Sequence, residues 1–498
     1  MIRRARTSGH LSLPLPSLEP WAKLNGATFN GIQCAEIPGS GSGVVAERDL
    51  RGATSGDEKS VDGDGPLMTV PKELILSLDS VKMFALADRD LREVLEGMGD
   101  FARTTRGAIM IFLLTQATTA YPELKEPRIG TRTPFTEYIQ FLPTELLPTS
   151  WTSDERYLLT TTTLHPATDA KQASLHREFE TLHKATKDVK WCADTWWNPT
   201  SPTHLDVSDW KFVDSMYRSR ALEYPGIGDA MVPCIDMANH AAGSDTIALY
   251  EMDGEGNAVL VLREGVSVRK GDEVTITYGD AKGACEMVFS YGFIDDAMVR
   301  EGDAKELFLD LEMMGDDPLA MAKNRVSTAA PGVKLMRTDE GVEWVSEYVY
   351  LIVVNEEDGL EFEVLQTTDG GRELRVSWKG DSLSDIGTLP SLLEKEELWP
   401  VFQLRAAAII QARVEEQLAS MEAFSDELQN IRFGEGTDIR EKPRDLAVKL
   451  HVLEKELCRK ASQALAMEVE ALSGTEIVKR YIAEMNGGGE PDEEVDLS

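Results

Sequence analysis

The chain has 498 residues, more than one ordinary domain holds, so we expect about two or three domains. Its 86 acidic residues against 51 Lys and Arg give a net charge of −35, which argues against nucleic acid as a partner, because non-specific binding needs a cationic surface. The acidic balance suits a basic protein partner, or serves solubility alone. No apolar run reaches the length of a membrane span, so no membrane partner is expected.

The chain begins with a basic segment that carries no acidic residue before Glu19. Pro14 and Pro16 interrupt it and its amphipathic pattern is weak, so we expect residues 1–20 to be disordered; a mitochondrial presequence is the alternative. Five scattered cysteines without a CxxC pair predict neither a zinc cluster nor a disulfide framework. They favour a reducing intracellular compartment, cytoplasmic or nuclear.

Predicted order begins near Trp21. The segment 31–50 predicts a strand, a glycine turn and a second strand, and the acidic Gly/Ser/Asp stretch 53–66 predicts a long solvated loop. Residues 67–78 predict another strand with a proline break. Much further along, residues 257–280 alternate apolar and polar side chains between Gly-Asp turns, which again predicts strands.

Residues from about 79 to 222 have a mainly helical pattern. Within this region the segment 174–186 places Leu175, Phe179 and Leu182 on one helical face. The region between the two predicted groups of strands is therefore expected to be a helical insertion.

Beyond about residue 305 the character of the sequence changes. The segment 344–380 contains a strand-like stretch with a "DGG" turn, whereas 398–424 and 445–474 predict helices whose apolar stripes pack a core. The acidic tail, residues 486–498, is expected to be disordered. We find no internal repeat.

The glycine-rich turn "GSGSG" (39–43) invites a phosphate-binding interpretation. A phosphate cradle, however, needs a helix whose N-terminus faces the anion, and here a short β-prone segment follows. The pattern favours a plain turn, in which glycines can still let a ligand approach the backbone.

A second candidate is "HREFETLH", with His176, Glu178, Glu180 and His183. The zinc-protease pattern needs two histidines at i and i+4 with a glutamate directly after the first, and this spacing fails that test. The segment therefore predicts a solvated helix face, and no metal site is expected.

The most informative segment is "VPCIDMANHAAG", which brings Asp236, Asn239 and His240 within five positions. His240 could be a general base, a metal ligand or a hydrogen-bonding clamp. Three tyrosines follow beside or within strand-like segments: Tyr250, Tyr278 in "ITYG" and Tyr291 in "YGF". A tyrosine in a strand is ordinarily a packing residue, but a "YG" pair twice within fourteen residues, after an Asn-His pair, indicates a site.

In this order, the motifs resemble the SET-domain protein methyltransferases, in particular the non-histone branch typified by the Rubisco large-subunit lysine methyltransferase. The resemblance covers residues from about 21 to 296 and rests on segments found in the family's order. These are the strand-turn-strand segment 31–50, "MTVPKEL" (68–74), the insertion-like 135–164, "SRAL" (219–222), "DMANH", "ITYG" and "YGF".

The resemblance implies an α+β fold. Small β-sheets are tied by a pseudoknot in which "DMANH" lies near "YGF", with a helical insertion at about 79–215. A mostly helical domain at 305–485 would bind substrate or partner; residues 344–380 depart from the branch's pattern there.

The implied reaction is methyl transfer from S-adenosylmethionine to a lysine of a non-histone protein, with no metal. The amine must be neutral, which a desolvated channel and the sulfonium charge both favour. Tyr278 is then the catalytic tyrosine, and Tyr250, Leu222 and Tyr291 line the substrate pocket. The implied cofactor-binding residues are Ser40, Gly41, Ser42, Gly43, Arg220, Asp236, Asn239, His240 and Tyr291.

Other functions stay open. An actin-histidine methyltransferase of this branch carries Asn two places after the motif arginine and lacks Tyr in its last glycine motif; Leu222 and Tyr291 here favour lysine. A SET-like binding module without catalysis and a metal-dependent hydrolase using Asp236 and His240 are further alternatives. We expect a monomer that acts on a basic protein.

Overall fold

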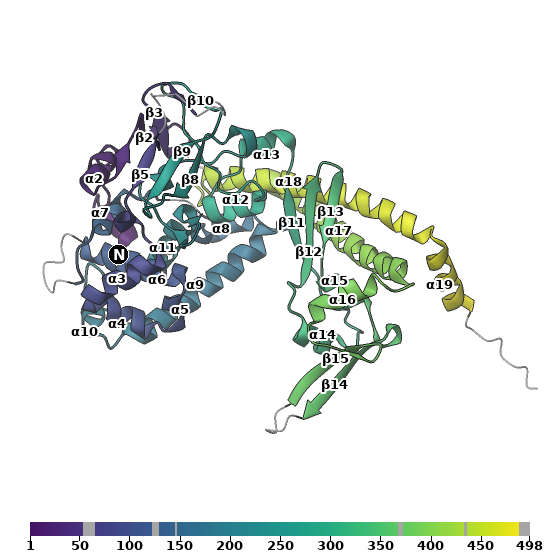
Figure 1. Ribbon diagram of the computed structural model, residues 1–498. Helices are drawn as coiled ribbons and strands as arrows, with labels where there is room; N and C mark the ends of the chain where they lie inside the picture. The colour runs from purple at the N-terminus through teal and green to yellow at the C-terminus, as the bar shows by residue number, and fades with distance from the viewer. Residues whose placement is uncertain (53–64, 122–128, 145–146, 367–371, 433–435, 488–498) are drawn as a thin grey trace, which may run out of the picture. The chain divides into compact units, whose positions relative to one another are not determined.

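The computed structural model describes residues 1–52, 65–121, 129–144, 147–366, 372–432 and 436–487 (Figure 1). They form two compact units: unit 1 comprises residues 1–152, 166–282 and 286–293, and unit 2 comprises 153–165, 283–285 and 294–498. Helices mixed with small antiparallel sheets confirm the predicted α+β class. Most of the predicted loop (53–64), the "DGG" turn and most of the predicted tail (488–498) lie outside the described residues.

Unit 1 contains several small antiparallel sheets. The predicted strand-turn-strand near the N-terminus is confirmed, since β2 (Ile32–Ile37) pairs with β3 (Gly41–Ala46). The largest sheet has the order β1-β5-β9-β8, so strands from both ends of the unit share it. The remaining strands of the unit are β1 (Thr28–Phe29), β4 (Leu50–Arg51), β5 (Met68–Val70), β6 (Leu222–Tyr224), β7 (Gly228–Ala230), β8 (Ala248–Met252), β9 (Ala258–Leu262) and β10 (Ser267–Val268).

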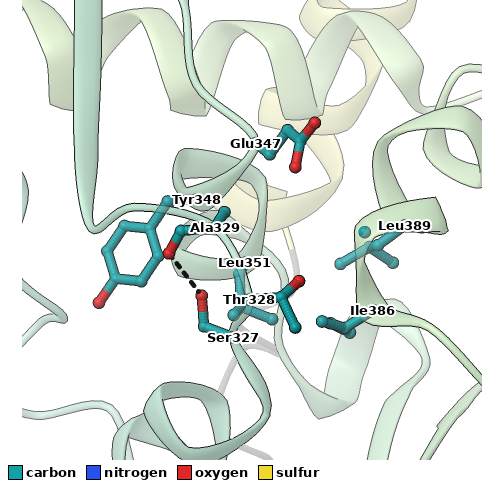
Figure 2. A pocket seen from close by; sticks show the side chains of 9 residues that line it. Ser327, Thr328, Ala329, Glu347, Tyr348, Leu351, Ile386 and Leu389 are labelled. Carbon is teal, nitrogen blue, oxygen red and sulfur yellow. Dashed lines mark hydrogen bonds between the residues drawn. The ribbon is translucent and has the colours of Figure 1, made fainter. Parts of the chain in front are cut away.

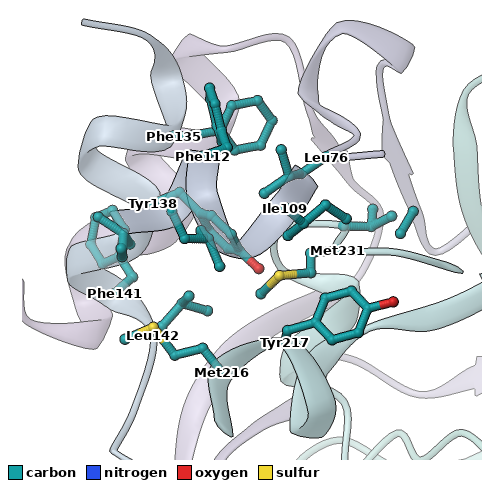
Figure 3. Packing of buried hydrophobic residues seen from close by; sticks show 14 of the residues in the cluster. Leu76, Ile109, Phe112, Phe135, Tyr138, Phe141, Leu142, Met216, Tyr217 and Met231 are labelled. Carbon is teal, nitrogen blue, oxygen red and sulfur yellow. The ribbon is translucent and has the colours of Figure 1, made fainter. Parts of the chain in front are cut away.

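The predicted helical region lies between β5 and β6. Its central helix, α6, is buried on all sides from Gly107 to Thr118, which explains its lack of a polar face. Figure 3 shows part of this core, in which the rings of Phe112 and Phe135 lie 5.7 Å apart. The helices are α3 (Leu78–Ala87), α4 (Arg89–Gly97), α5 (Asp100–Arg103), α6 (Thr105–Thr119), α7 (Pro134–Phe141), α8 (Ser153–Tyr157), α9 (Leu164–Thr186), α10 (Lys190–Asp194) and α11 (Val207–Arg220).

Local sequence explains where several of these helices begin. The side chains of Ser77, Asp88, Thr104, Thr133 and Asp206 each accept a hydrogen bond from a backbone N–H of the first turn that follows. Such caps satisfy amide groups that the helix itself leaves unpaired. The caps therefore fix where five helices of the insertion begin.

The prediction of a disordered N-terminus is wrong. Residues Ile2–Thr7 form α1 and Leu18–Leu24 form α2, and Met1, Ile2 and Leu18 are buried in the core of unit 1. The basic character has a structural use, because the Arg6 guanidinium donates to the carbonyls of Ile139 (2.9 Å) and Leu142 (2.7 Å) near the end of α7.

Unit 2 is built on two long helices, α17 (Trp399–Asn430) and α18 (Glu441–Ser473), which confirm the helices predicted for 398–424 and 445–474. The two helices pack against each other (Figure 1). Two three-stranded antiparallel sheets accompany them. The strands are β11 (Glu306–Asp310), β12 (Gly332–Thr338), β13 (Gly341–Val345), β14 (Leu360–Gln366), β15 (Arg372–Trp378) and β16 (Asp381–Leu383). The shorter helices are α12 (Ala284–Tyr291, shared with unit 1), α13 (Asp296–Glu301), α14 (Ala320–Val326), α15 (Tyr348–Val353), α16 (Leu389–Leu393) and α19 (Glu476–Gly487).

The segment 344–380 contains strands β14 and β15, which confirms the predicted strand-like stretch, while its residues Tyr348–Val353 form a helix. Five of its six side chains are buried, and a short apolar run that is buried on all sides has no period from which helix and strand can be told apart. None of the described helices combines the length and apolar character needed to cross a bilayer.

Candidate active site

The "DMANH" loop and the "ITYG" segment lie side by side in unit 1. The N–H of Ala241 donates to the carbonyl of Ile276, and the N–H of Ile276 donates to the carbonyl of Asn239, each at 2.9 Å. Residues His240 and Ile276 form an isolated parallel bridge, so residues 273–280 are not the regular strand that the alternation predicted. Two segments about forty positions apart are thereby fixed in register.

Tyr278 is bonded to the "DMANH" loop through both its backbone and its side chain. Its hydroxyl donates to the carbonyl of Ala238 at 2.8 Å, and its backbone N–H donates to Nδ1 of His240 at 3.0 Å. Because Nδ1 accepts that bond, it carries no proton. Of the three roles considered for His240, general base, metal ligand and hydrogen-bonding clamp, this geometry supports the hydrogen-bonding clamp.

Tyr291 and Phe293 complete an aromatic group around Tyr278. The ring centroids of Tyr278 and Tyr291 are 4.6 Å apart, and the Phe293 ring lies 6.2 to 6.4 Å from those of His240, Tyr278 and Tyr291. Tyr291 ends helix α12 and is not part of a strand, contrary to expectation. Gly292 follows with φ of +75°, a left-handed conformation that suits glycine and ends the helix. Phe293 was not predicted as a site residue, although it is part of the "YGF" motif.

Tyr250 lies on β8 and contacts a residue that the sequence did not indicate, Tyr224 on β6. Their ring centroids are 5.1 Å apart at 60°. Burial, followed by Tyr291 and Glu223, raises the pKa of Tyr250, and burial holds the pKa of Tyr224 well above its usual value. Both phenols are therefore neutral at physiological pH. Leu222 precedes Tyr224 by two positions on the same strand, so both side chains share one face.

Arg220 and Asp236 meet behind the loop. The Arg220 guanidinium donates to the backbone carbonyl of Asp236 at 2.6 Å, while the hydroxyl of Tyr138 donates to the Asp236 carboxylate at 2.5 Å. Burial raises the pKa of Asp236 to about 6, although Arg220 and Tyr138 oppose this shift. Asp236 therefore ties the loop to helix α7 of the insertion; Tyr138 is visible in Figure 3.

The glycine turn reaches the same loop at Gly43. A Cβ atom there would lie 2.4 Å from Ile37 and 3.0 Å from both the Asn239 amide and the Glu273 carboxylate, so only glycine fits. The Asn239 amide donates to Glu273 at 2.7 Å. Glu273 was not predicted, since a glutamate after "KGD" has the pattern of an exposed turn.

The outer part of that turn is open. Nothing lies within 4 Å of a Cβ placed at Gly39 or Gly41, and both residues have positive φ. Ser40 is exposed, and the hydroxyl of Ser42 is buried without a hydrogen-bond partner among the described residues. A ligand can therefore approach this backbone closely and pair with Ser42.

The second candidate motif, "HREFETLH", is structural. Glu178 is not on a solvated face, because its carboxylate pairs with Arg106 at 2.9 Å and accepts from the Trp210 indole at 3.0 Å. Among the residues that the structure describes, no group of three or more His, Cys, Asp or Glu side chains could hold a metal ion.

Comparison with known structures identifies the fold. Rubisco LSMT bound to AdoMet superposes with a TM-score of 0.62 at 16% identity, covering 97% of this chain and 98% of that chain. The SET domain of LSMT bound to lysine and AdoHcy gives a TM-score of 0.61 at 16% identity, with 96% of each chain covered. The protein has the SET-domain fold, and the predicted resemblance is confirmed.

Sequence comparison adds two relatives of somewhat higher identity. SET domain-containing protein 8 of Schizosaccharomyces pombe (strain 972 / ATCC 24843) is 25% identical over 343 residues, 67% of this chain and 73% of that protein. Human actin-histidine N-methyltransferase is 24% identical over 295 residues, which span 56% of this chain but only 42% of the human protein. No protein-family model matches the chain.

Proposed function

We propose that this protein is an S-adenosylmethionine-dependent protein-lysine N-methyltransferase that acts on a non-histone protein. The observation that carries the proposal is the Tyr278 hydroxyl, bonded to the Ala238 carbonyl within the aromatic group of His240, Tyr291 and Phe293, on a SET-domain fold. Solved neighbours with this fold bind AdoMet, AdoHcy, lysine and methyl-lysine, which supports the assignment.

The residues present fit the cofactor. The open backbone of the glycine turn, with the unpaired Ser42 hydroxyl, would hold its polar groups, and Asn239, His240 and Arg220 converge on the adjacent loop. When bound, S-adenosylmethionine supplies a methyl group activated by a sulfonium charge. Asp236 serves indirectly by holding the loop against Tyr138.

The substrate amine has to lose its proton before transfer. A free lysine has a pKa near 10.4, so only about one in 2,500 is neutral at pH 7. The phenol rings of Tyr250 and Tyr291 would enclose the lysine stem, and neither side chain carries a carboxylate that would stabilise the ammonium form by a full charge. Because the Tyr278 proton is directed to the Ala238 carbonyl, the lone pairs of that phenol oxygen remain to accept a hydrogen bond from the amine. The residues thus align the nucleophile, and alignment is the main requirement of this reaction.

The proposal also covers the acceptor residue, the kind of substrate protein and the place of action in the cell. Leu222 and Tyr291 occupy the positions that favour lysine, although a histidine methyltransferase is among the relatives. The net charge of −35 suits a basic substrate protein. We propose a monomer acting in the cytoplasm or nucleus, with a mitochondrial location as the alternative.

The test is a labelled-methyl assay on a cell lysate with the wild-type protein and Tyr278→Phe. We expect the substitution to reduce labelling on the order of a hundredfold, since it removes one positioned polar group, while AdoMet affinity in calorimetry stays within about threefold. Tyr157→Phe is the matched control, because that hydroxyl is exposed and bonds to Glu427 in unit 2. Equal labelling by the wild type and Tyr278→Phe would show that another residue is catalytic. A protein that does not bind AdoMet would exclude the methyltransferase function. Methyl-histidine found by mass spectrometry would show that the acceptor residue is histidine and not lysine.

A further inference from the structure

The outer strand of a sheet in unit 2 borders an open groove. β13 pairs with β12 along one edge, and no strand of the described residues pairs with its other edge. A groove of about 500 Å³ lies beside this strand, a volume typical of ligand sites. We call it the β13 groove; its lining includes Glu343, Trp344, Val345, Glu347, Tyr350 and Glu468.

A neighbouring cavity shares Glu347 with the groove but is far smaller. Figure 2 shows it between Ser327, Tyr348 and Leu389, where about 10 Å³ is free. This is room for a single water molecule at most. The β13 groove is therefore the one of these two spaces that can take a larger ligand.

Aromatic rings form one wall of the groove. The rings of Trp344 and Tyr350 lie 6.2 Å apart, and Tyr350 lies 5.2 Å from Trp399. The Trp344 indole donates to the Glu468 carboxylate at 2.9 Å, which holds ring and carboxylate in one place. A fixed aromatic ring beside a carboxylate suits a cation, above all a guanidinium, which can stack and pair at once.

The charge of the groove has one sign. Its lining contains three glutamates, Glu343, Glu347 and Glu468, and no Lys, Arg or His. In the part of the chain that the structure describes, none of the three forms an ion pair. Burial, and after it Glu468 and Glu394, raises the pKa of Tyr350 to about 12, which reports the same negative surroundings.

We propose that the β13 groove binds an extended basic segment of a partner protein, which pairs with the free edge of β13 and places a cationic side chain against the Trp344 ring and beside the Glu468 carboxylate. An unpaired strand edge offers main-chain hydrogen bonds to an extended chain. Alternate side chains of that chain then face the carboxylates, because strand side chains alternate with a period of two. Half-exposed Val345, 54% accessible, supplies apolar contact.

A second copy of this chain fits the groove poorly. Symmetric pairing of two β13 edges would place Glu343 and Glu347 of one copy close to the same glutamates of the other, and like charges oppose each other across an interface. The carboxylates thus favour a basic partner over self-association.

The test uses the full chain without AdoMet, so that its outcome is independent of methyl transfer. A fluorescent peptide that alternates Arg and Val, capped at both ends, is titrated and followed by anisotropy. Its analogue with citrulline in place of Arg should bind at least about tenfold more weakly. The triple variant E343Q/E347Q/E468Q should weaken binding of the Arg peptide by about tenfold, and Trp344→Leu should weaken it as well.

The matched control is E361Q/E363Q/E373Q, which removes the same charge from exposed glutamates on the β14–β15 hairpin of the same unit. It should leave binding within about twofold; an equal loss would show attraction by net charge alone and overturn the site. Two peptides N-methylated on alternate residues test strand pairing, since only one set of N–H groups can face β13. Equal binding by both would exclude an added strand, and a dimer in sedimentation that the triple variant strengthens would assign the edge to self-association.

Discussion

Asp236 in unit 1 and Glu454 in unit 2 are both buried carboxyl groups, yet their partners differ. Asp236 lies near the Arg220 guanidinium and accepts from the Tyr138 hydroxyl; its pKa is about 6. Glu454 accepts from the N–H and the hydroxyl of Thr163, at 2.9 and 2.6 Å, and its pKa is about 7. Burial is the first cause of both shifts, and only Asp236 has a nearby cation to oppose it.

The difference shows two ways of holding a loop. The candidate active site uses a carboxylate that remains charged at neutral pH because a cation and a phenol stabilise it. Unit 2 anchors the segment 153–165 to α18 with a carboxyl group that titrates near neutrality. Thr161 on that segment has a left-handed φ of +69°, which is unfavourable for threonine. Its hydroxyl bonds to His451, so contacts with α18 also stabilise this strained backbone conformation.

The largest expected effect comes from removing the cation beside Asp236. Arg220→Met should cost about 3 kcal/mol of unfolding free energy at pH 7.5, because it leaves a buried carboxylate without its counter-charge. The loss should shrink below pH 6, where Asp236 is protonated and needs no cation. Denaturant unfolding followed by circular dichroism at both pH values measures this.

The control for that experiment is Arg89→Met on α4, whose side chain is 79% exposed and pairs with Glu93 in the same helix. It should leave stability unchanged at both pH values. A loss for Arg220→Met that is the same at pH 5 and pH 7.5 would mean that Arg220 acts through packing and not through the charge of Asp236.

Some of this architecture follows from local sequence and some does not. The strands at 31–50 and the helices at 398–424 and 445–474 have clear periods and defined turns, so pattern alone predicts them. Pattern alone did not separate helix α15 from the strands of 344–380, and it did not place Tyr291 at a helix end, because short buried apolar runs carry no period.

The contacts that define the site are of another kind. Tyr138 and Asp236 are 98 positions apart, and Thr163 and Glu454 are 291 apart. No local pattern specifies such pairs. The family resemblance located Asp236, Asn239 and Tyr278, but not their respective partners Tyr138, Glu273 and Phe293. The N-terminus was missed for the same reason, since its basic residues bind carbonyl groups more than a hundred positions away.

A smaller effect, of opposite sign, is expected for Glu454→Gln. The folded-state pKa of about 7 lies above the ordinary value of 4.5, so the folded state binds more protons between these values. The contribution of Glu454 to stability should therefore fall as pH rises from about 4.5 through 7, and the difference in stability between wild type and variant should follow that fall, since His451, whose pKa is lowered to about 4, is present in both. At pH 8 we expect Glu454→Gln to be more stable than the wild type by about 2 kcal/mol. Hydrogen exchange of α18 as a function of pH measures this locally, and a difference in protection between wild type and variant that stays constant from pH 5 to 8 would contradict it.

The smallest effect tests whether the phenol, too, keeps Asp236 charged. Tyr138→Phe removes one hydrogen bond to a buried carboxylate and should cost about 1.5 kcal/mol at pH 7.5. It should also move the pKa of Asp236 upward from about 6, because the hydroxyl favours the charged form. Tyr217→Phe is the comparator, since it removes a phenol that donates to the exposed carboxylate of Asp229 at 2.8 Å. NMR titration of the Asp236 carboxyl carbon distinguishes the two variants: a shift in Tyr138→Phe alone supports the charged anchor. Equal titration curves would mean that Arg220, and not the Tyr138 hydroxyl, keeps the pKa of Asp236 below that of Glu454.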